Sequence, residues 1–149
     1  MGEVALAEIA SVSLTIPSDY GYVVLVVVAT WILLNWLALQ VMKARKKYEV
    51  AYPKLYDERS HDFNCVQRAH QNTLENITCF LLFLLIGGLL YPRLSALFGI
   101  IYLASRVVYA YGYYTGDPSK RNRGAFGYVG LLGLIVNTIL FAISLLGWI

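Results

Sequence analysis

Apolar runs long enough to cross a lipid bilayer are the feature that most limits how this chain can fold. Residues 20–41 continue for about twenty residues without a charged side chain, which is the length that an α-helix needs to cross about 30 Å of hydrocarbon. Hydrophobic residues make up 58% of the 149 residues and charged residues 14%. A soluble core of this size cannot bury so much apolar surface. The sequence therefore predicts an all-α integral membrane protein.

We expect one domain, residues 1–149, built as a bundle of four transmembrane helices over about 20–41, 64–90, 94–114 and 125–149. The second of these is polar in its first half and aliphatic from Phe80 to Leu90. Pro92 separates it from the third because proline lacks the N–H that a continuing helix needs. The segment before the first predicted helix, residues 1–19, has acidic residues and does not begin with basic ones, so a removable signal peptide is not expected.

Basic residues predict the orientation of the chain. They gather in the two polar loops that a four-helix topology places on one side, whereas the opposite side has Arg93. Lys and Arg are retained on the cytoplasmic side of membranes, so we expect cytosolic loops and luminal termini. The basic loop residues are Lys43, Arg45, Lys46, Lys47, Lys54 and Arg59 in the first loop and Lys120, Arg121 and Arg123 in the second.

Two stripes of polar residues interrupt the apolar helices. One has Arg68, Asn72 and Glu75 at positions i, i+4 and i+7, on one face of the second helix. The other is on the third helix and consists of Tyr102, Arg106, Tyr109 and Tyr113. Ionisable groups at membrane depth are costly and mark functional sites by default. The arginines outnumber the carboxylate, which predicts a site for a small, anionic cytosolic ligand. The alternative is that Arg68, Glu75 and Arg106 only pair to hold the bundle together.

Other polar residues exclude several kinds of site. Cys65 and Cys79 lie on one predicted helix, roughly 20 Å apart, so no disulfide joins them. The histidines show no ligand spacing, so no metal is expected. His70 lies off the Arg68 face and is expected to contact a neighbouring helix or subunit. No run of Lys and Arg is long enough to predict nucleic-acid binding.

Three segments make the chain similar to a known family. Residues 63–75, residues 106–118 and the segment from Lys43 to Tyr48 resemble the microsomal glutathione S-transferase type 3 branch of the membrane-associated eicosanoid and glutathione metabolism (MAPEG) family. The resemblance extends from about Tyr20 to the end. It implies a homotrimer of four-helix, multi-pass subunits in the endoplasmic reticulum membrane. It also implies that glutathione binds between adjacent subunits on the cytosolic side.

The resemblance assigns roles to individual residues. Arg68, Asn72 and Glu75 are implied to bind glutathione from one subunit, and the third-helix residues of the neighbouring subunit complete the site. These are Arg106, Tyr109 and Tyr113, with Arg45 and His70 at weaker-matching positions. The arginine that stabilises the glutathione thiolate in the family falls just after the third helix. Arg121 and Arg123 both fit that position, and the sequence leaves both open as the catalytic residue.

The implied activity uses glutathione as co-substrate. The thiolate would attack a lipophilic electrophile, or reduce a lipid hydroperoxide, that arrives through membrane lipid. Leukotriene C4 formation is left open, and Asn76 stands where some leukotriene-forming relatives carry a tyrosine. The main rival is a non-catalytic lipid-presenting protein of the same fold, against which the retained arginines argue. An ion pathway would need a continuous polar route, and residues 80–90 offer none.

Overall fold

The computed structural model describes residues 15–148, so most of the expected lead-in segment lies outside the described residues. Within that range the chain is all-helical, with four α-helices and one 3-10 helix: α1 Tyr20–Tyr48, α2 His61–Gly87, α3 Pro92–Tyr114, η1 Pro118–Gly124 and α4 Gly127–Leu145. Among them, α1, α3 and α4 are each long and apolar enough to cross a membrane. The polar first half of α2 lowers its hydropathy. The expectation that α2 also crosses therefore stays a prediction.

The helix ends follow local capping chemistry. α1 continues beyond the predicted end at Val41 through the basic residues, and it stops where Glu49 adopts a left-handed conformation and donates its N–H to the carbonyl of Arg45. α2 begins before the predicted Asn64 because the Ser60 hydroxyl accepts the N–H of Phe63 at 3.3 Å. α3 begins at Pro92, whose fixed φ suits the first helical position.

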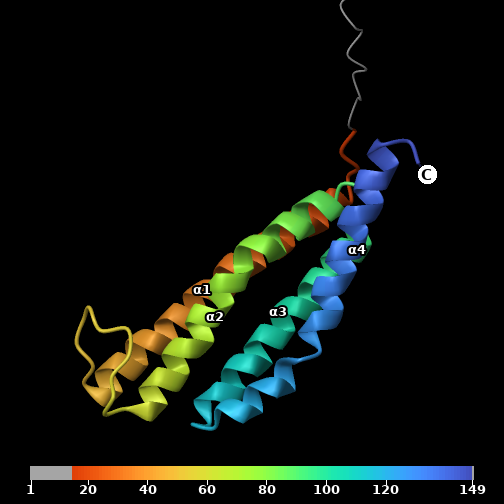
Figure 1. Ribbon diagram of the computed structural model, residues 1–149. Coiled ribbons are helices and arrows are strands. Elements are labelled where there is room, and N and C mark those ends of the chain that lie inside the picture. The colour runs from red at the N-terminus through yellow and green to blue at the C-terminus, as the bar shows by residue number, and fades with distance from the viewer. Residues whose placement is uncertain (1–14, 149) are drawn as a thin grey trace, which may run out of the picture.

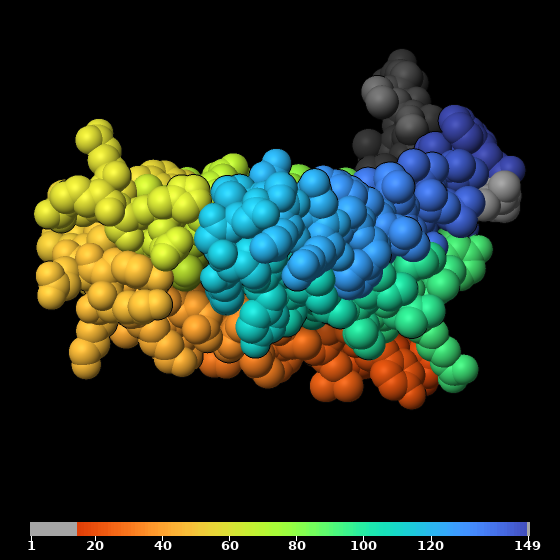
Figure 2. All heavy atoms as spheres, turned by 90° about the horizontal axis from the view of Figure 1, so that it is seen from below, coloured from red at the N-terminus to blue at the C-terminus, as the bar shows by residue number. Residues whose placement is uncertain are grey.

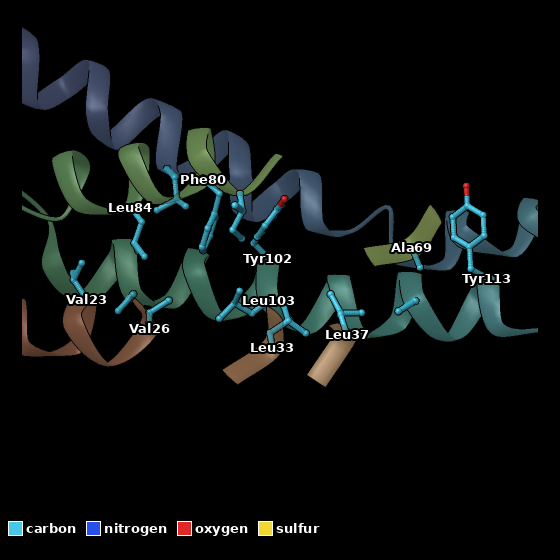
Figure 3. Close-up of a cluster of buried hydrophobic side chains, with 14 of the residues drawn as sticks. Val23, Val26, Leu33, Leu37, Ala69, Phe80, Leu84, Tyr102, Leu103 and Tyr113 are labelled. Carbon is cyan, nitrogen blue, oxygen red and sulfur yellow. The ribbon is translucent and has the colours of Figure 1, made fainter. Parts of the chain in front are cut away.

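The four α-helices run up and down beside one another (Figure 1). α1 and α4 lie on opposite sides, and each packs against both α2 and α3. The buried core includes side chains of α1, α2 and α3, and within it Phe80 of α2 stacks on Tyr102 of α3 (Figure 3). Large apolar side chains also face outward, as on α1, where Trp31 is 65% exposed. An outward apolar surface of this kind suits contact with lipid.

The two polar loops lie at the same end of the bundle, and the C-terminus lies at the other (Figure 1). In Figure 2, η1 and α4 (cyan to blue) form a continuous ridge along the molecule. η1 packs against α3 at the loop end of that ridge. The second basic loop, which forms η1, therefore packs against α3, the helix with the stripe of Tyr102, Arg106, Tyr109 and Tyr113. That the loop end faces the cytosol stays a prediction.

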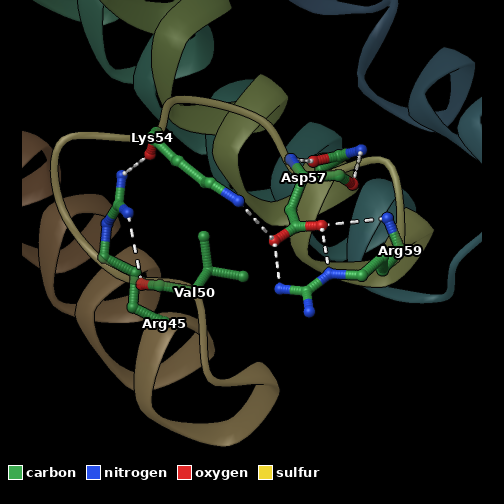
Figure 4. A network of polar contacts seen from close by, with 6 residues as sticks. Arg45, Val50, Lys54, Asp57 and Arg59 are labelled. Atoms are coloured by element: carbon green, nitrogen blue, oxygen red, sulfur yellow. Dashed lines mark hydrogen bonds and ion pairs between the residues drawn. The ribbon is translucent and has the colours of Figure 1, made fainter.

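The loop between α1 and α2 is fixed by its own charged side chains (Figure 4). The Asp57 carboxylate accepts hydrogen bonds from Nε and Nη2 of Arg59 at 3.1 and 3.0 Å. These bonds hold the pKa of Asp57 well below its usual range. The buried Arg45 donates to the carbonyl of Lys54 at 2.7 Å, and its guanidinium lies over the ring of Tyr52. Arg45 therefore ties the loop to the end of α1.

Candidate functional site

Arg106 on α3 is the buried centre of the site. Its Nη2 donates to Oδ1 of Asn72 and to the hydroxyl of Thr73, each at 2.9 Å, and its Nε donates to the same hydroxyl at 3.1 Å. The side chain is 8% exposed, and its guanidinium lies 3.8 Å from the ring centroid of Tyr109. All of these partners are neutral. The positive charge of Arg106 is therefore held in place by hydrogen bonds and is not cancelled by a carboxylate within residues 15–148.

The α2 stripe forms, as its spacing predicts. Arg68 Nη1 lies 2.8 Å from Glu75 Oε1, and Asn72 Nδ2 lies 3.4 Å from the other Glu75 oxygen. The Arg68 and Glu75 side chains are 40% and 44% exposed. Because both charges are on α2, this ion pair does not connect two helices of the chain. The alternative of a purely bundle-locking network therefore has no support from Arg68 and Glu75 within one chain.

The two stripes meet within one chain. The resemblance assigns them to adjacent subunits, whereas the structure joins Asn72 of α2 directly to Arg106 of α3. The reason is that the Ala69, Thr73 and Ile77 face of α2 is buried in the core, which turns the adjacent Asn72 toward α3. Thr73 also accepts both guanidinium bonds while donating to the carbonyl of Ala69 at 2.9 Å.

A cavity of about 300 Å³ opens beside Arg106, between α2, α3, η1 and α4. We call it the η1 cavity. Its polar end contains Arg106, Arg121, Asn72 and Tyr109, and no acidic residue lines it. The other lining residues are Asn76, Tyr102, Ser105, Asn122, Gly124, Ala125, Gly127, Tyr128 and Leu131. Two cationic side chains without a carboxylate make this cavity suited to an anionic ligand.

The 3-10 helix η1 places Arg121, and not Arg123, at the cavity. Asp117 caps η1 by accepting the N–H of Ser119 at 3.0 Å and its hydroxyl at 2.7 Å, and these bonds lower the pKa of Asp117. Arg121 Nη1 donates to the carbonyl of Pro118 at 3.0 Å, which orients the side chain. Arg121 and Arg123 are both exposed on η1, but Arg123 does not line the cavity.

Glycines allow η1 to lie this close to α3. A Cβ added at Gly112 would lie 2.6 Å from the carbonyl carbon of Lys120 and 2.9 Å from the nitrogen of Arg121. A Cβ at Gly124 would lie 2.7 Å from the carbonyl oxygen of Ser105 on α3. Gly112 and Thr73 were not predicted from the sequence as site residues. A glycine inside a helix is a signal of close packing, but it does not identify what packs there.

The remaining residues that the sequence singles out lie outside the η1 cavity. Arg45 is engaged by the α1–α2 loop, as described above, and lies at the end of α1. Tyr113 is buried and contacts the ring of Tyr109 edge-on, with centroids 5.2 Å apart. His70 is half-buried on α2. Within a single chain, therefore, the structure brings together around one space the predicted residues Asn72, Tyr102, Arg106, Tyr109 and Arg121.

Known proteins match nearly the whole chain. The model of the MAPEG family matches residues 23–145, a range that includes every predicted site residue. Microsomal glutathione S-transferase 2 from Bos taurus is 34% identical over 113 residues, which cover 75% of this chain and 74% of that protein. The human protein of the same name is 34% identical, with 74% and 73% covered. An uncharacterized protein from Synechocystis is 32% identical, with 70% and 75% covered.

Proposed function

Because the chain belongs to the MAPEG family, we propose that it is a membrane-bound glutathione transferase that activates glutathione as a thiolate beside Arg121. The named relatives are microsomal glutathione S-transferases of type 2, which supports a transferase of this class. The resemblance to the type 3 branch stays a prediction. Peroxidase activity toward lipid hydroperoxides and leukotriene C4 formation belong to the same proposal as further reactions of the thiolate.

The observation that carries the proposal is the η1 cavity, where Arg106 and Arg121 face one space without an acidic lining residue. Glutathione is an anion at neutral pH, and guanidinium groups bind carboxylates through paired, charge-assisted hydrogen bonds. Arg106 already has its guanidinium fixed by Thr73 and Asn72. It can therefore hold a carboxylate with little further loss of side-chain freedom.

Arg121 has the role of thiolate stabilisation in this proposal. A free thiol titrates near pH 8.5, so only a small fraction is thiolate at neutral pH. A guanidinium beside the sulfur favours the charged form, and each unit by which the thiol pKa falls corresponds to about 1.4 kcal/mol. The thiol proton leaves to water, and the thiolate is the better nucleophile. Arg121 is assigned this role over Arg123 because it alone of the two lines the cavity.

The electrophile is proposed to enter from the lipid. The η1 cavity extends from the arginines toward Tyr128 and Leu131 of α4. Tyr128 is 69% exposed on the outer surface of α4, where an apolar molecule dissolved in the bilayer would meet it. The thiolate and the electrophile would then meet between the polar end and the apolar end of one cavity. Such a division of polar and apolar walls is usual for small-molecule sites.

The assembly and the location of the protein are also proposals. The exposed Arg68–Glu75 ion pair lies on the outer face of α2, where a second subunit of a homotrimer would cover it. Four transmembrane helices would place both basic loops on the cytosolic side of the endoplasmic reticulum membrane. Tyr56 of the α1–α2 loop donates to Gln71 on that face of α2 at 2.7 Å, so the loop would border the same interface.

The proposal is tested by titrating glutathione into the purified protein in detergent at neutral pH and recording ultraviolet difference absorbance in the thiolate band. We expect a saturable thiolate signal, because the cationic cavity favours the charged form of the sulfur. Binding without this signal would instead support the non-catalytic, lipid-presenting alternative. The control is S-methyl glutathione, which has the same charges but no thiol and is expected to give no signal.

Arg68 does not line the η1 cavity of its own chain, but the resemblance assigns it to glutathione at a subunit boundary. Replacing it with alanine is therefore expected to weaken glutathione binding by about tenfold, because a charge-assisted contact to a ligand carboxylate is lost. Calorimetry measures the affinity, and size-exclusion chromatography with light scattering measures the assembly. The variant is expected to assemble as the wild type does. If the assembly dissociates instead, the Arg68–Glu75 pair has a structural role, and its assignment to the ligand is wrong.

A further inference from the structure

Asn76, Tyr102 and Ser105 are three residues with hydroxyl or amide groups that line the η1 cavity on α2 and α3 beside Arg106, and two of them bond to nearby backbone. Ser105 donates its hydroxyl to the carbonyl of Tyr102 at 2.6 Å. Asn76 donates its amide to the carbonyl of Asn72 at 2.8 Å. Both contacts are local bonds to the backbone of the same helix. The Ser105 proton is therefore committed, and the second N–H of the Asn76 amide can donate a hydrogen bond but is not an acid that transfers its proton.

Tyr102 differs from them. Its side chain is 5% exposed and lines the cavity, yet its hydroxyl has no hydrogen-bond partner within residues 15–148. Buried tyrosine hydroxyls usually find such a partner. Figure 3 shows the ring beside Phe80, with the hydroxyl pointing away from α1. The cavity is thus bordered by a hydroxyl donor on a largely buried side chain, and this hydroxyl is left available.

The Tyr102 ring is also held in place. It stacks on Phe80 with the ring centroids 4.4 Å apart and an interplanar angle of 18°. Tyr102 lies four residues before Arg106 on α3, so the two side chains share one face of that helix. Gly130 of α4 permits close packing behind the residue, since a Cβ there would lie 2.9 Å from the Tyr102 nitrogen. A fixed donor of this kind needs little reorganisation during a reaction.

We propose that the Tyr102 hydroxyl is the proton donor to the oxygen of an electrophile whose reaction leaves an alkoxide, with a lipophilic epoxide as the substrate class. This inference rests on the proposed function, because it needs a glutathione thiolate at the Arg121 end of the cavity. It adds a second catalytic residue with a separate task. Arg121 acts on the nucleophile, and Tyr102 acts on the leaving oxygen.

The glutathione sulfur forms a bond to one epoxide carbon, and the bond from that carbon to oxygen breaks with its electron pair remaining on the oxygen. The oxygen takes the Tyr102 proton, which gives a hydroxy thioether and a phenolate. Water then returns a proton to the phenolate, equal to the one that glutathione released on becoming a thiolate. An aryl chloride needs no such donor, because chloride leaves without being protonated.

The test compares two electrophiles in the full chain in detergent. Turnover of glutathione with styrene oxide and with chlorodinitrobenzene is measured for the wild type, for Tyr102→Phe and for Tyr111→Phe. The last variant is the matched control, since Tyr111 is also on α3 but is 59% exposed and packs against Trp36 outside the cavity. Phenylalanine removes only the hydroxyl, so the stacking on Phe80 is expected to remain.

We expect Tyr102→Phe to lower the ratio of styrene oxide to chlorodinitrobenzene turnover by about 10²-fold, the usual contribution of a general acid. Tyr111→Phe should leave that ratio as in the wild type. An unchanged ratio in Tyr102→Phe would overturn the proposal, and so would an equal loss with both electrophiles, which would indicate a structural role. If the wild type itself gives no thiolate signal and no turnover, the proposed function fails, and this inference fails with it.

Discussion

Replacing Arg121 with alanine is expected to abolish the thiolate signal of bound glutathione and to lower turnover by about 10²-fold. This is the usual loss in rate when an active site loses one preorganised hydrogen-bond donor to a negatively charged atom. Arg121 lines the η1 cavity, where the positive charges have no acidic neighbour among the lining residues. Without its guanidinium the thiol should return toward its ordinary pKa, near 8.5, so that thiolate forms only at higher pH. The measurement is the difference absorbance of the complex as a function of pH, together with kcat.

Arg123→Ala is the matched control, because it removes the same charge from the same 3-10 helix outside the cavity. Its turnover is expected to stay within about twofold of the wild type, which is the usual range for an exposed charge. Arg121→Lys should recover part of the signal, since it keeps the charge but loses the planar guanidinium. A loss in Arg123→Ala with normal turnover in Arg121→Ala would reverse the assignment. Normal turnover in both variants would show that neither arginine activates the thiol.

Replacing Gly112 with alanine is expected to lower turnover by about 10²-fold, although Gly112 contacts no ligand in the proposed mechanism. The added methyl group would overlap backbone atoms of Lys120 and Arg121. Backbone atoms cannot move aside as the end of a flexible side chain can. The 3-10 helix must then move away from α3. A displacement of about 1 Å in a residue that positions the reacting group can cost this much in rate. Hydrogen exchange over residues 118–124 should increase in the same variant.

Gly21→Ala provides the comparison, because a Cβ at Gly21 meets no atom within 4 Å. It adds the same methyl group to a helix, and it should leave both turnover and hydrogen exchange unchanged. The double variant Arg121→Ala with Gly112→Ala should have almost the same turnover as either single variant, since both substitutions act through the Arg121 side chain. A fully additive loss would contradict the idea that Gly112 acts by positioning Arg121.

The α2 stripe could be predicted from helical periodicity alone. Three polar residues at i, i+4 and i+7 must share one face of a helix, and the structure pairs Arg68 with Glu75 on that face. The same spacing argument placed Tyr102, Arg106, Tyr109 and Tyr113 on one face of α3, and the contacts between Arg106, Tyr109 and Tyr113 agree with it. Helical geometry is local, so the sequence alone was sufficient for both stripes.

Other features depended on contacts between segments that are distant in the sequence. Which neighbour Arg106 meets was decided by the packing of α2 on α3, which brings Thr73 to within 3.1 Å of it. Arg45, which the resemblance places at glutathione, donates to the carbonyl of Lys54 and lies over the ring of Tyr52 within one chain, and its role at glutathione stays a prediction. The contacts of a side chain beside a loop depend on the path of that loop, and loops lack the regular repeat from which a helix face can be predicted.

The sequence by itself determined that the chain is helical and apolar, where its polar faces lie, and which family it resembles, because these follow from hydropathy and from a fixed helical repeat. It could not choose between Arg121 and Arg123, which lie two positions apart in one short loop. The tertiary structure distinguishes the two by position, since Arg121 alone of them lines the η1 cavity, and the catalytic role of Arg121 stays a proposal. The close approach of η1 to α3 at Gly112 and Gly124 turns Arg121 toward the cavity and leaves Arg123 outside it. The physical reason is steric: the backbones of η1 and α3 can approach this closely because Gly112 of α3 and Gly124 of η1 have no Cβ.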